Sequence, residues 1–205
     1  MRTQDEALAA LTQSWPAIVE ESRSVLGSEL HYQAVVYHCM RQVGQVPPKQ
    51  IGMNVKILIY DVISDHFKAK DLRKAPDYQG GFEPIPDVVI FKPEIGGDFR
   101  RRNRANTLRQ MLIAIEIKAS ERDKDRLKPK EVIDDILKLD ALRLEARHRE
   151  VDVLPAMIVF DTAPDLVEQM RKEAVDAARS AAEERNVCFF YLSREEEFHV
   201  IPATP

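Results

Sequence analysis

The stretch LIAIEIKAS, residues 112–120, constrains the fold more than any other part of the sequence. Its isoleucines and other apolar side chains predict a strand over residues 111–119. Because side chains two apart on a strand point the same way, Glu116 and Lys118 share one face. A sheet edge with one solvated face would explain the two charges, and a catalytic strand would explain them as well.

Other segments show the periodicities of strands and helices. We expect strands at 51–63, 85–92, 152–161 and 186–193, with 197–202 as an additional edge strand. We expect helices at 4–26 in two pieces, at 28–44, from Pro129 through Leu144, and at 163–185. Ser14 is expected to cap the second piece of the first helix, and Ser28 to cap the second helix.

The order of these elements is one helical region, three successive strands, and then helices alternating with strands. It predicts an α/β domain with a central mixed β-sheet flanked by helices. We expect residues 1–27 to be an N-terminal helical extension of a domain over 28–205, the two forming one structural unit. Residues 64–80 are expected to be irregular with a short helix, and residues 94–110 to be a long loop.

The composition indicates a cytoplasmic protein with a core of ordinary size. The chain has 205 residues, 44% of them hydrophobic, so it can bury a core without disulfides. Cys39 and Cys188 lie in apolar surroundings and are expected to be buried free thiols. No apolar stretch approaches the ~20 residues that span a bilayer, and the N-terminus lacks a signal-peptide pattern, so we expect no membrane partner.

Charge is unevenly distributed along the chain. The net charge is −4, yet residues 100–130 hold eleven Lys and Arg against four Asp and Glu, which leaves +7 there and −11 elsewhere. A basic band on an acidic body suggests a surface for a polyanion. A solvated loop that serves only solubility is the simpler alternative.

The strand pattern also suggests a metal site. If the strands at 85–92 and 111–119 are neighbours, Asp87 can lie near Glu116, and two carboxylates suit Mg²⁺, which completes its shell with waters and phosphate. Lys118 would lie beside the metal and could hold a phosphate oxygen. The histidines show no HExxH or paired Cys/His spacing, and the glycine-rich nucleotide-binding and serine-hydrolase motifs are absent from the sequence.

Pro86-Asp87, followed by a strand that carries Glu116-Ile117-Lys118, resembles the PD-(D/E)XK nuclease superfamily, which has a restriction-endonuclease-like fold. The superfamily core is a helix, three strands, a helix and a further strand (αβββαβ). This matches the order from about residue 28 to residue 161, and leaves an extra C-terminal helix and strand. The resemblance implies that Asp87 and Glu116 are metal ligands and that Lys118 is the catalytic lysine. It also implies that Glu29, on the first core helix, is an auxiliary acid of the metal site.

The resemblance further implies hydrolysis of phosphodiester bonds, in DNA by our expectation, with Mg²⁺ as cofactor and Mn²⁺ as a substitute. Arg100, Arg101, Arg102 and Arg104 are then expected beside the site as phosphate contacts. The helix from Pro129 carries no QxxxY motif, and offers Asp134, Asp135 and Lys138 without a reason to prefer any of them.

Two other functions stay open at this point. One is a catalytically silent nucleic-acid- or protein-binding module that keeps the fold. The other is a non-nuclease enzyme with a carboxylate metal site. No separate DNA-reading segment is visible, so sequence specificity would require a homodimer or a partner protein.

Overall fold

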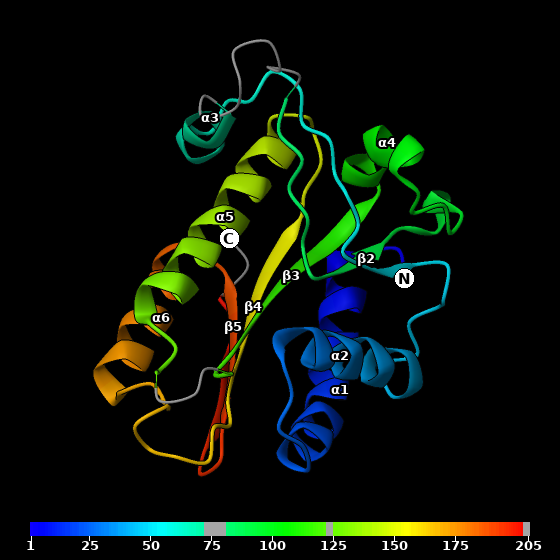
Figure 1. Ribbon diagram of the computed structural model, residues 1–205. Coiled ribbons are helices and arrows are strands. Elements are labelled where there is room, and N and C mark those ends of the chain that lie inside the picture. Colours follow the sequence, from blue (N-terminus) through cyan, green and yellow to red (C-terminus); the bar gives the residue numbers. More distant parts are fainter. Residues whose placement is uncertain (72–80, 122–124, 203–205) are drawn as a thin grey trace.

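The structure is a computed structural model that describes residues 1–71, 81–121 and 125–202. Within this part of the chain, six strands form one open mixed sheet, and helices cover both of its faces (Figure 1). The strands are β1 (Ile51–Met53), β2 (Val88–Phe91), β3 (Met111–Ala119), β4 (Leu154–Asp161), β5 (Cys188–Ser193) and β6 (Glu197–Val200). The α/β class and the central mixed sheet predicted from the sequence are confirmed.

The strands lie in the sheet in their order along the chain. The pairs β1–β2, β2–β3 and β5–β6 are antiparallel, whereas β3–β4 and β4–β5 are parallel. Parallel neighbours need a crossover connection, and the helices α5 (Pro129–Arg147) and α6 (Lys172–Glu184) supply the two crossovers. Strands β3 and β4 therefore form the centre of the sheet. Both are buried, and their sequences are nearly continuous apolar runs.

Two helical layers enclose the sheet. Helices α1 (Gln4–Arg23) and α2 (Glu29–Gln42) pack on one face, and α5 and α6 pack on the other, as Figure 1 shows. The pleat of β3 divides its side chains between these layers, so that Ile115 and Ile117 belong to the α1–α2 side and Ala114 to the α5–α6 side. Glu116, by the same alternation, faces α5.

Helix α1 is a single helix, so the predicted break near Ser14 is wrong. Ser14 is buried inside it, and its hydroxyl donates to the carbonyl of Ala10 at 2.7 Å instead of capping a new helix. Pro16 lies within the helix, where its missing N–H removes one internal hydrogen bond. Packing compensates for that loss, because the ring of Trp15 lies 5.1 Å from the ring of Phe190 on β5. Thus α1 is built into the core beside α2.

Several predicted boundaries are also wrong. The strand expected over 51–63 ends at Met53, because Asn54 adopts a left-handed backbone with φ 51°, and Ile59 makes only an isolated bridge to Phe82. Strand β2 and helix α6 are shorter than expected. Ser28 precedes α2, but its side chain makes no capping hydrogen bond. The loop predicted over residues 94–110 is partly helical, because it overlaps η1 (Pro93–Ile95) and contains η2 (Arg101–Asn103) and α4 (Arg104–Arg109).

Three other expectations are confirmed: a short helix, an edge strand and two buried thiols. The short helix expected within 64–80 is α3 (Asp65–Asp71), while residues 72–80 lie outside the described part. The edge strand β6 is present, and Cys39 and Cys188 are buried free thiols. Among the described residues, no helix combines the length and the apolar character needed to cross a membrane.

Replacing Trp15 tests whether α1 is part of the core. Trp15 is 3% exposed, so Trp15→Ala should leave a cavity and lower the free energy of unfolding by about 3–5 kcal/mol. Urea unfolding followed by circular dichroism measures this loss. Tyr60→Ala, at an aromatic side chain in a residue that is 54% exposed, is the control and should change stability by no more than about 0.5 kcal/mol. Equal effects of the two variants would contradict the packing described here.

Candidate active site

Asp87 directly precedes β2 and faces Glu116 across the sheet. The pairing of Val88 with Ile115 in the antiparallel register places Asp87 opposite Glu116 when the register is continued by one residue. The Asp87 amide donates to the carbonyl of Ile115 at 3.0 Å, and its Oδ2 accepts the amide of Ile117 at 2.6 Å. The carboxylate thus accepts a hydrogen bond from the backbone of β3 at the point where β2 begins.

Three elements hold the Asp87 carboxylate in this position. Its second oxygen, Oδ1, accepts from Nε2 of Gln33 on α2 at 2.7 Å, and Oε1 of Gln33 accepts from Nδ2 of Asn54 at 3.0 Å. Asn54 also donates its backbone amide to the carbonyl of Asp87 at 3.0 Å. The left-handed turn that ends β1 therefore serves to bring Asn54 onto Asp87. The chain of hydrogen bonds fixes the carboxylate between α2 and β3.

Glu116 is the most deeply buried acid of the site. The residue is 2% exposed, and its Oε1 lies 2.7 Å from Nζ of Lys138 on α5. The ammonium approaches outside the angles of a hydrogen bond, so that Oε1 is ion-paired but accepts no hydrogen bond. A buried carboxylate without such a counter-ion would carry a large desolvation cost, and Lys138 reduces that cost.

Lys118 connects the two helical layers. Its Nζ lies 2.9 Å from Asp135 Oδ2 on α5, and 3.2 and 3.3 Å from the two carboxylate oxygens of Glu29 on α2. The reach to both sides is possible because β2 pairs with β3 only as far as Ile115, which leaves the edge open beside Lys118. Glu29 begins α2, and its amide donates to the Glu121 carboxylate at 2.9 Å.

The structure thus brings together the four residues named from the sequence: Glu29, Asp87, Glu116 and Lys118. Comparison with protein-family models, curated protein sequences and solved structures finds no match to this chain. What the site can do follows from its own chemistry.

Electrostatics set the protonation of the buried acids. Burial raises the pKa of Glu116 to about 8; the Lys138 ammonium opposes this rise and the Asp87 carboxylate adds to it. Burial likewise raises the pKa of Asp87 to about 6, against the hydrogen bond from Ile117. For Lys118 burial lowers the pKa, but Asp135 and Glu29 outweigh burial and raise it above its ordinary value. Neighbouring carboxylates that resist ionisation together are a pattern found at catalytic and metal sites.

The charges of the network leave room for a divalent cation. Four carboxylates (Glu29, Asp87, Glu116 and Asp135) and two ammonium groups (Lys118 and Lys138) sum to −2 when all are ionised. Among the described residues, no group of three or more His, Cys, Asp or Glu side chains is arranged to hold a metal. Two carboxylates are nevertheless the usual protein contribution to Mg²⁺, because this ion keeps several waters. Carboxylate oxygens are hard donors of the kind that Mg²⁺ takes, whereas structural and catalytic zinc sites rely on Cys and His.

A small cavity opens beside Lys118. It has a volume of about 150 Å³ and is lined by Glu29, Lys118, Ala119, Glu121, Leu127 and Glu131. Three of these six lining residues are therefore acidic, and one, Lys118, is basic. An anionic substrate approaching this mouth is repelled unless a cation neutralises part of the charge.

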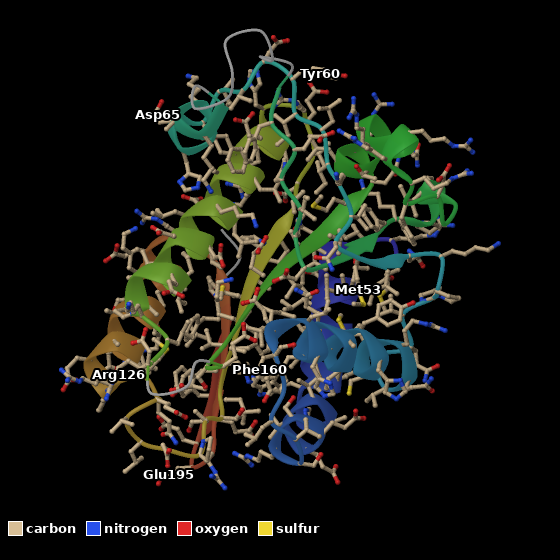
Figure 2. All side chains as sticks on the ribbon, in the orientation of Figure 1. Met53, Tyr60, Asp65, Arg126, Phe160 and Glu195 are labelled. Atoms are coloured by element: carbon tan, nitrogen blue, oxygen red, sulfur yellow. The ribbon has the colours of Figure 1, made fainter. Side chains whose placement is uncertain are left out.

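The basic residues 100–130 do not form one surface. Arg126 lies just before α5 at one end of the molecule, whereas α4 lies at the other (Figures 1 and 2). The four arginines lie on or beside η2 and α4, which precede β3, whereas Lys118 lies seven residues beyond the start of β3, roughly 23 Å along the strand. That they contact phosphate beside the site stays a prediction. Residues 122–124 of this segment lie outside the described part.

The arginines are paired with local acids. Arg100 and Arg102 contact Asp98, and Arg101 and Arg104 contact Glu83. The Arg102 contact is the longest of these at 3.9 Å, and its side chain is 69% exposed. These pairs hold the arginine-bearing segment in shape and reduce its net positive charge.

Sequence reasoning missed Gln33 and Asn54, and it named Asp135 and Lys138 without assigning them to the site. Gln33 shares a helix face with Glu29, four residues earlier, which is a detectable signal. Asp135 and Lys138 are three apart on α5, but this helix also buries Glu145, so a charged residue on the helix does not by itself mark the turn that meets β3. Asn54 gives no signal, because the residues around it in the sequence do not predict its left-handed backbone conformation.

Neutralising Asp87 should stabilise the protein in a pH-dependent way. Between the ordinary pKa of 3.8 and about 6, the unfolded chain has lost this proton and the folded chain still holds it, so wild-type stability falls as pH rises through this window. Asp87→Asn removes the effect. Its stability relative to wild type should therefore increase between pH about 4 and about 7, by up to about 3 kcal/mol.

Chemical denaturation at several pH values measures this difference. Asp65→Asn, at a fully exposed carboxylate on α3, is the matched control. If the stability difference between Asp87→Asn and wild type is the same at every pH, folding does not raise the pKa of Asp87.

Proposed function

We propose that this protein is a Mg²⁺-dependent nuclease that hydrolyses phosphodiester bonds within DNA. The observation that carries the proposal is the cross-strand placement of Asp87 opposite Glu116, with Lys118 two residues further along the same face of β3. This arrangement joins two metal-binding carboxylates to a fixed ammonium group at an open sheet edge. Carboxylates, a divalent cation and a cationic side chain are the recurring parts of phosphoryl-transfer sites.

The fold supports the same proposal. The elements α2, β1, β2, β3, α5 and β4 follow the helix–strand order of the restriction-endonuclease-like core, and α6, β5 and β6 extend it. The paired acids lie where the PD-(D/E)XK pattern would put them, at the start of the second strand and within the third. We therefore assign the protein to this nuclease superfamily as part of the proposal.

Asp87 and Glu116 would hold the metal, with Glu29 as an auxiliary acid and Mn²⁺ as a substitute ion. The bound ion would supply positive charge against the phosphate and lower the pKa of a water molecule. Gln33 and Ile117 keep the Asp87 carboxylate in one orientation, which preorganises the ligand before the ion arrives. Burial of Glu116 keeps bulk water from competing for its oxygens.

Lys118 would act on the phosphate itself. Its ammonium lines the cavity and is held by Asp135 and Glu29, so it can donate to a phosphate oxygen without a large loss of side-chain entropy. Its raised pKa keeps it protonated at neutral pH, which suits charge stabilisation and excludes a role as a general base there. Hydrolysis breaks the bond from phosphorus to the leaving oxygen as a water oxygen adds to phosphorus.

The contact between Lys138 and Glu116 favours a second candidate function. An ammonium group at 2.7 Å already neutralises the carboxylate that a metal would need. If this pair were permanent, the protein would be a silent module that keeps the fold and binds nucleic acid or protein. The two functions differ in whether divalent cations bind and whether DNA strands are cut.

Cleavage of plasmid and single-stranded DNA in the presence of Mg²⁺, and its loss with a chelator, tests the proposal. Glu116→Ala and Lys118→Ala should each reduce the cleavage rate by at least about 100-fold, because each removes charge aimed at the reacting phosphate. Glu184→Ala and Lys172→Ala remove the same charges from exposed positions on α6 and should leave the rate unchanged.

Each alternative has its own result in this assay. DNA binding without cleavage under any metal condition would favour the silent module. Metal binding that depends on Glu116, with no strand cleavage, would favour a non-nuclease enzyme. Cleavage that persists in both Glu116→Ala and Lys118→Ala would exclude the proposed site.

The exposed arginines are proposed to contact the DNA backbone away from the cleavage site. Arg102→Ala should weaken DNA binding equally for different sequences and reduce the slope of log K against log salt by about 1. Arg185→Ala, whose guanidinium has an equally loose 3.9 Å partner on α6, is the control and should leave the slope unchanged. Fluorescence anisotropy at several salt concentrations measures both, and an unchanged slope for Arg102→Ala would remove it from the interface.

A further inference from the structure

We infer that Lys138 holds the place of the divalent cation on Glu116 and leaves it when the cation binds. The site would then work by exchange of one cation for another, with α5 supplying the resident one. This inference rests on the proposed function, because it assumes that Glu116 is a metal ligand. It adds a residue and a regulation of metal loading to that function.

The first argument is that two cations compete for one buried carboxylate. Lys138 Nζ lies 2.7 Å from Glu116 Oε1, and Mg²⁺ would lie about 2.1 Å from its ligand oxygens. Two positive charges at such distances from one carboxylate repel each other strongly in a buried site. The Glu116 side chain is 3% exposed, so the ion has little room to approach while the ammonium stays.

The second argument is that Lys138 has somewhere to go. Its side chain is 20% exposed, and Asp134 lies four residues earlier on α5, within reach on the same helix face. The Asp134 carboxylate is half exposed and pairs with Lys130 near the start of α5. A rotation of the flexible Lys138 stem from Glu116 towards Asp134 would keep the ammonium beside an anion. Lys118, clamped between Glu29 and Asp135, has no comparable freedom.

The third argument concerns the groups that face Lys138 from neighbouring elements. Glu116 faces Lys138 from β3, and Asp134 and Asp135 lie on the same helix as Lys138. Lys70 of α3 interacts electrostatically with these three carboxylates and with Lys138. Lys70 adds a second positive charge near Lys138, and His66 of α3 faces the same group. Repulsion between the two ammonium groups weakens the hold of Glu116 on Lys138. The resident cation is therefore poised to leave.

Amine labelling of the wild-type protein tests the exchange. An acylating reagent followed by mass spectrometry reports how fast each lysine reacts, with and without millimolar Mg²⁺. Binding of Mg²⁺ is measured in parallel by titration calorimetry on wild type, Glu116→Gln and Lys138→Met. Mg²⁺ should raise the labelling rate of Lys138 at least fivefold in wild type, because the released ammonium becomes accessible. Lys172, exposed on α6, should react at the same rate throughout.

The outcomes separate this inference from the proposed function. Mg²⁺ binding that requires Glu116, together with faster labelling of Lys138, supports both. The same binding with an unchanged Lys138 rate overturns the exchange and leaves the metal site standing. Binding by Lys138→Met but not by wild type shows that Lys138 occupies the cation position, and contradicts the metal-dependent function of the wild-type chain. Absence of binding in both proteins overturns both proposals.

Discussion

The hydrogen bond from the Ile117 amide to the Asp87 carboxylate is the interaction on which the site depends. Strand β2 pairs with β3 only from Val88 onwards, so the backbone of β3 beyond that point would be an open edge inside the molecule. A buried amide without a partner costs as much as a lost hydrogen bond. A side chain replaces the missing strand, and this substitution brings a carboxylate next to Glu116. The sheet edge and the acid pair are therefore a single structural feature.

The same arrangement makes the site costly for the folded chain. Burial of Asp87 and Glu116 raises the pKa of both acids, so at neutral pH the folded state either retains protons or carries charges that lack solvent. Lys138 and Lys118 offset this cost from opposite ends of the cluster, one at Glu116 and the other between Glu29 and Asp135. A protein that needed only stability would place apolar side chains here. Retaining the charged groups is understandable if they serve binding or chemistry.

The sequence predicted the sheet and its central strand well, because apolar runs and Glu116–Lys118 spacing depend only on local pattern. Residues 111–119 were predicted with the observed boundaries of β3. The pattern failed where tertiary contacts override local preference, as at Asn54, whose left-handed turn ends an otherwise regular alternation. It could not place the arginines, since their position depends on how residues 94–110 fold. The partners Asp135 and Lys138 could not be chosen from sequence, because which turn of α5 meets β3 is decided by packing.

The bridge that Lys118 makes between α2 and α5 has a mechanical consequence. The two helices lie on opposite faces of the sheet. At the open edge, the Lys118 ammonium group forms an ion pair with one carboxylate from each helix. The spacing of Glu29 on α2 and Asp135 on α5 therefore depends on a single side chain, so that a change at Lys118 would alter both helix contacts at once.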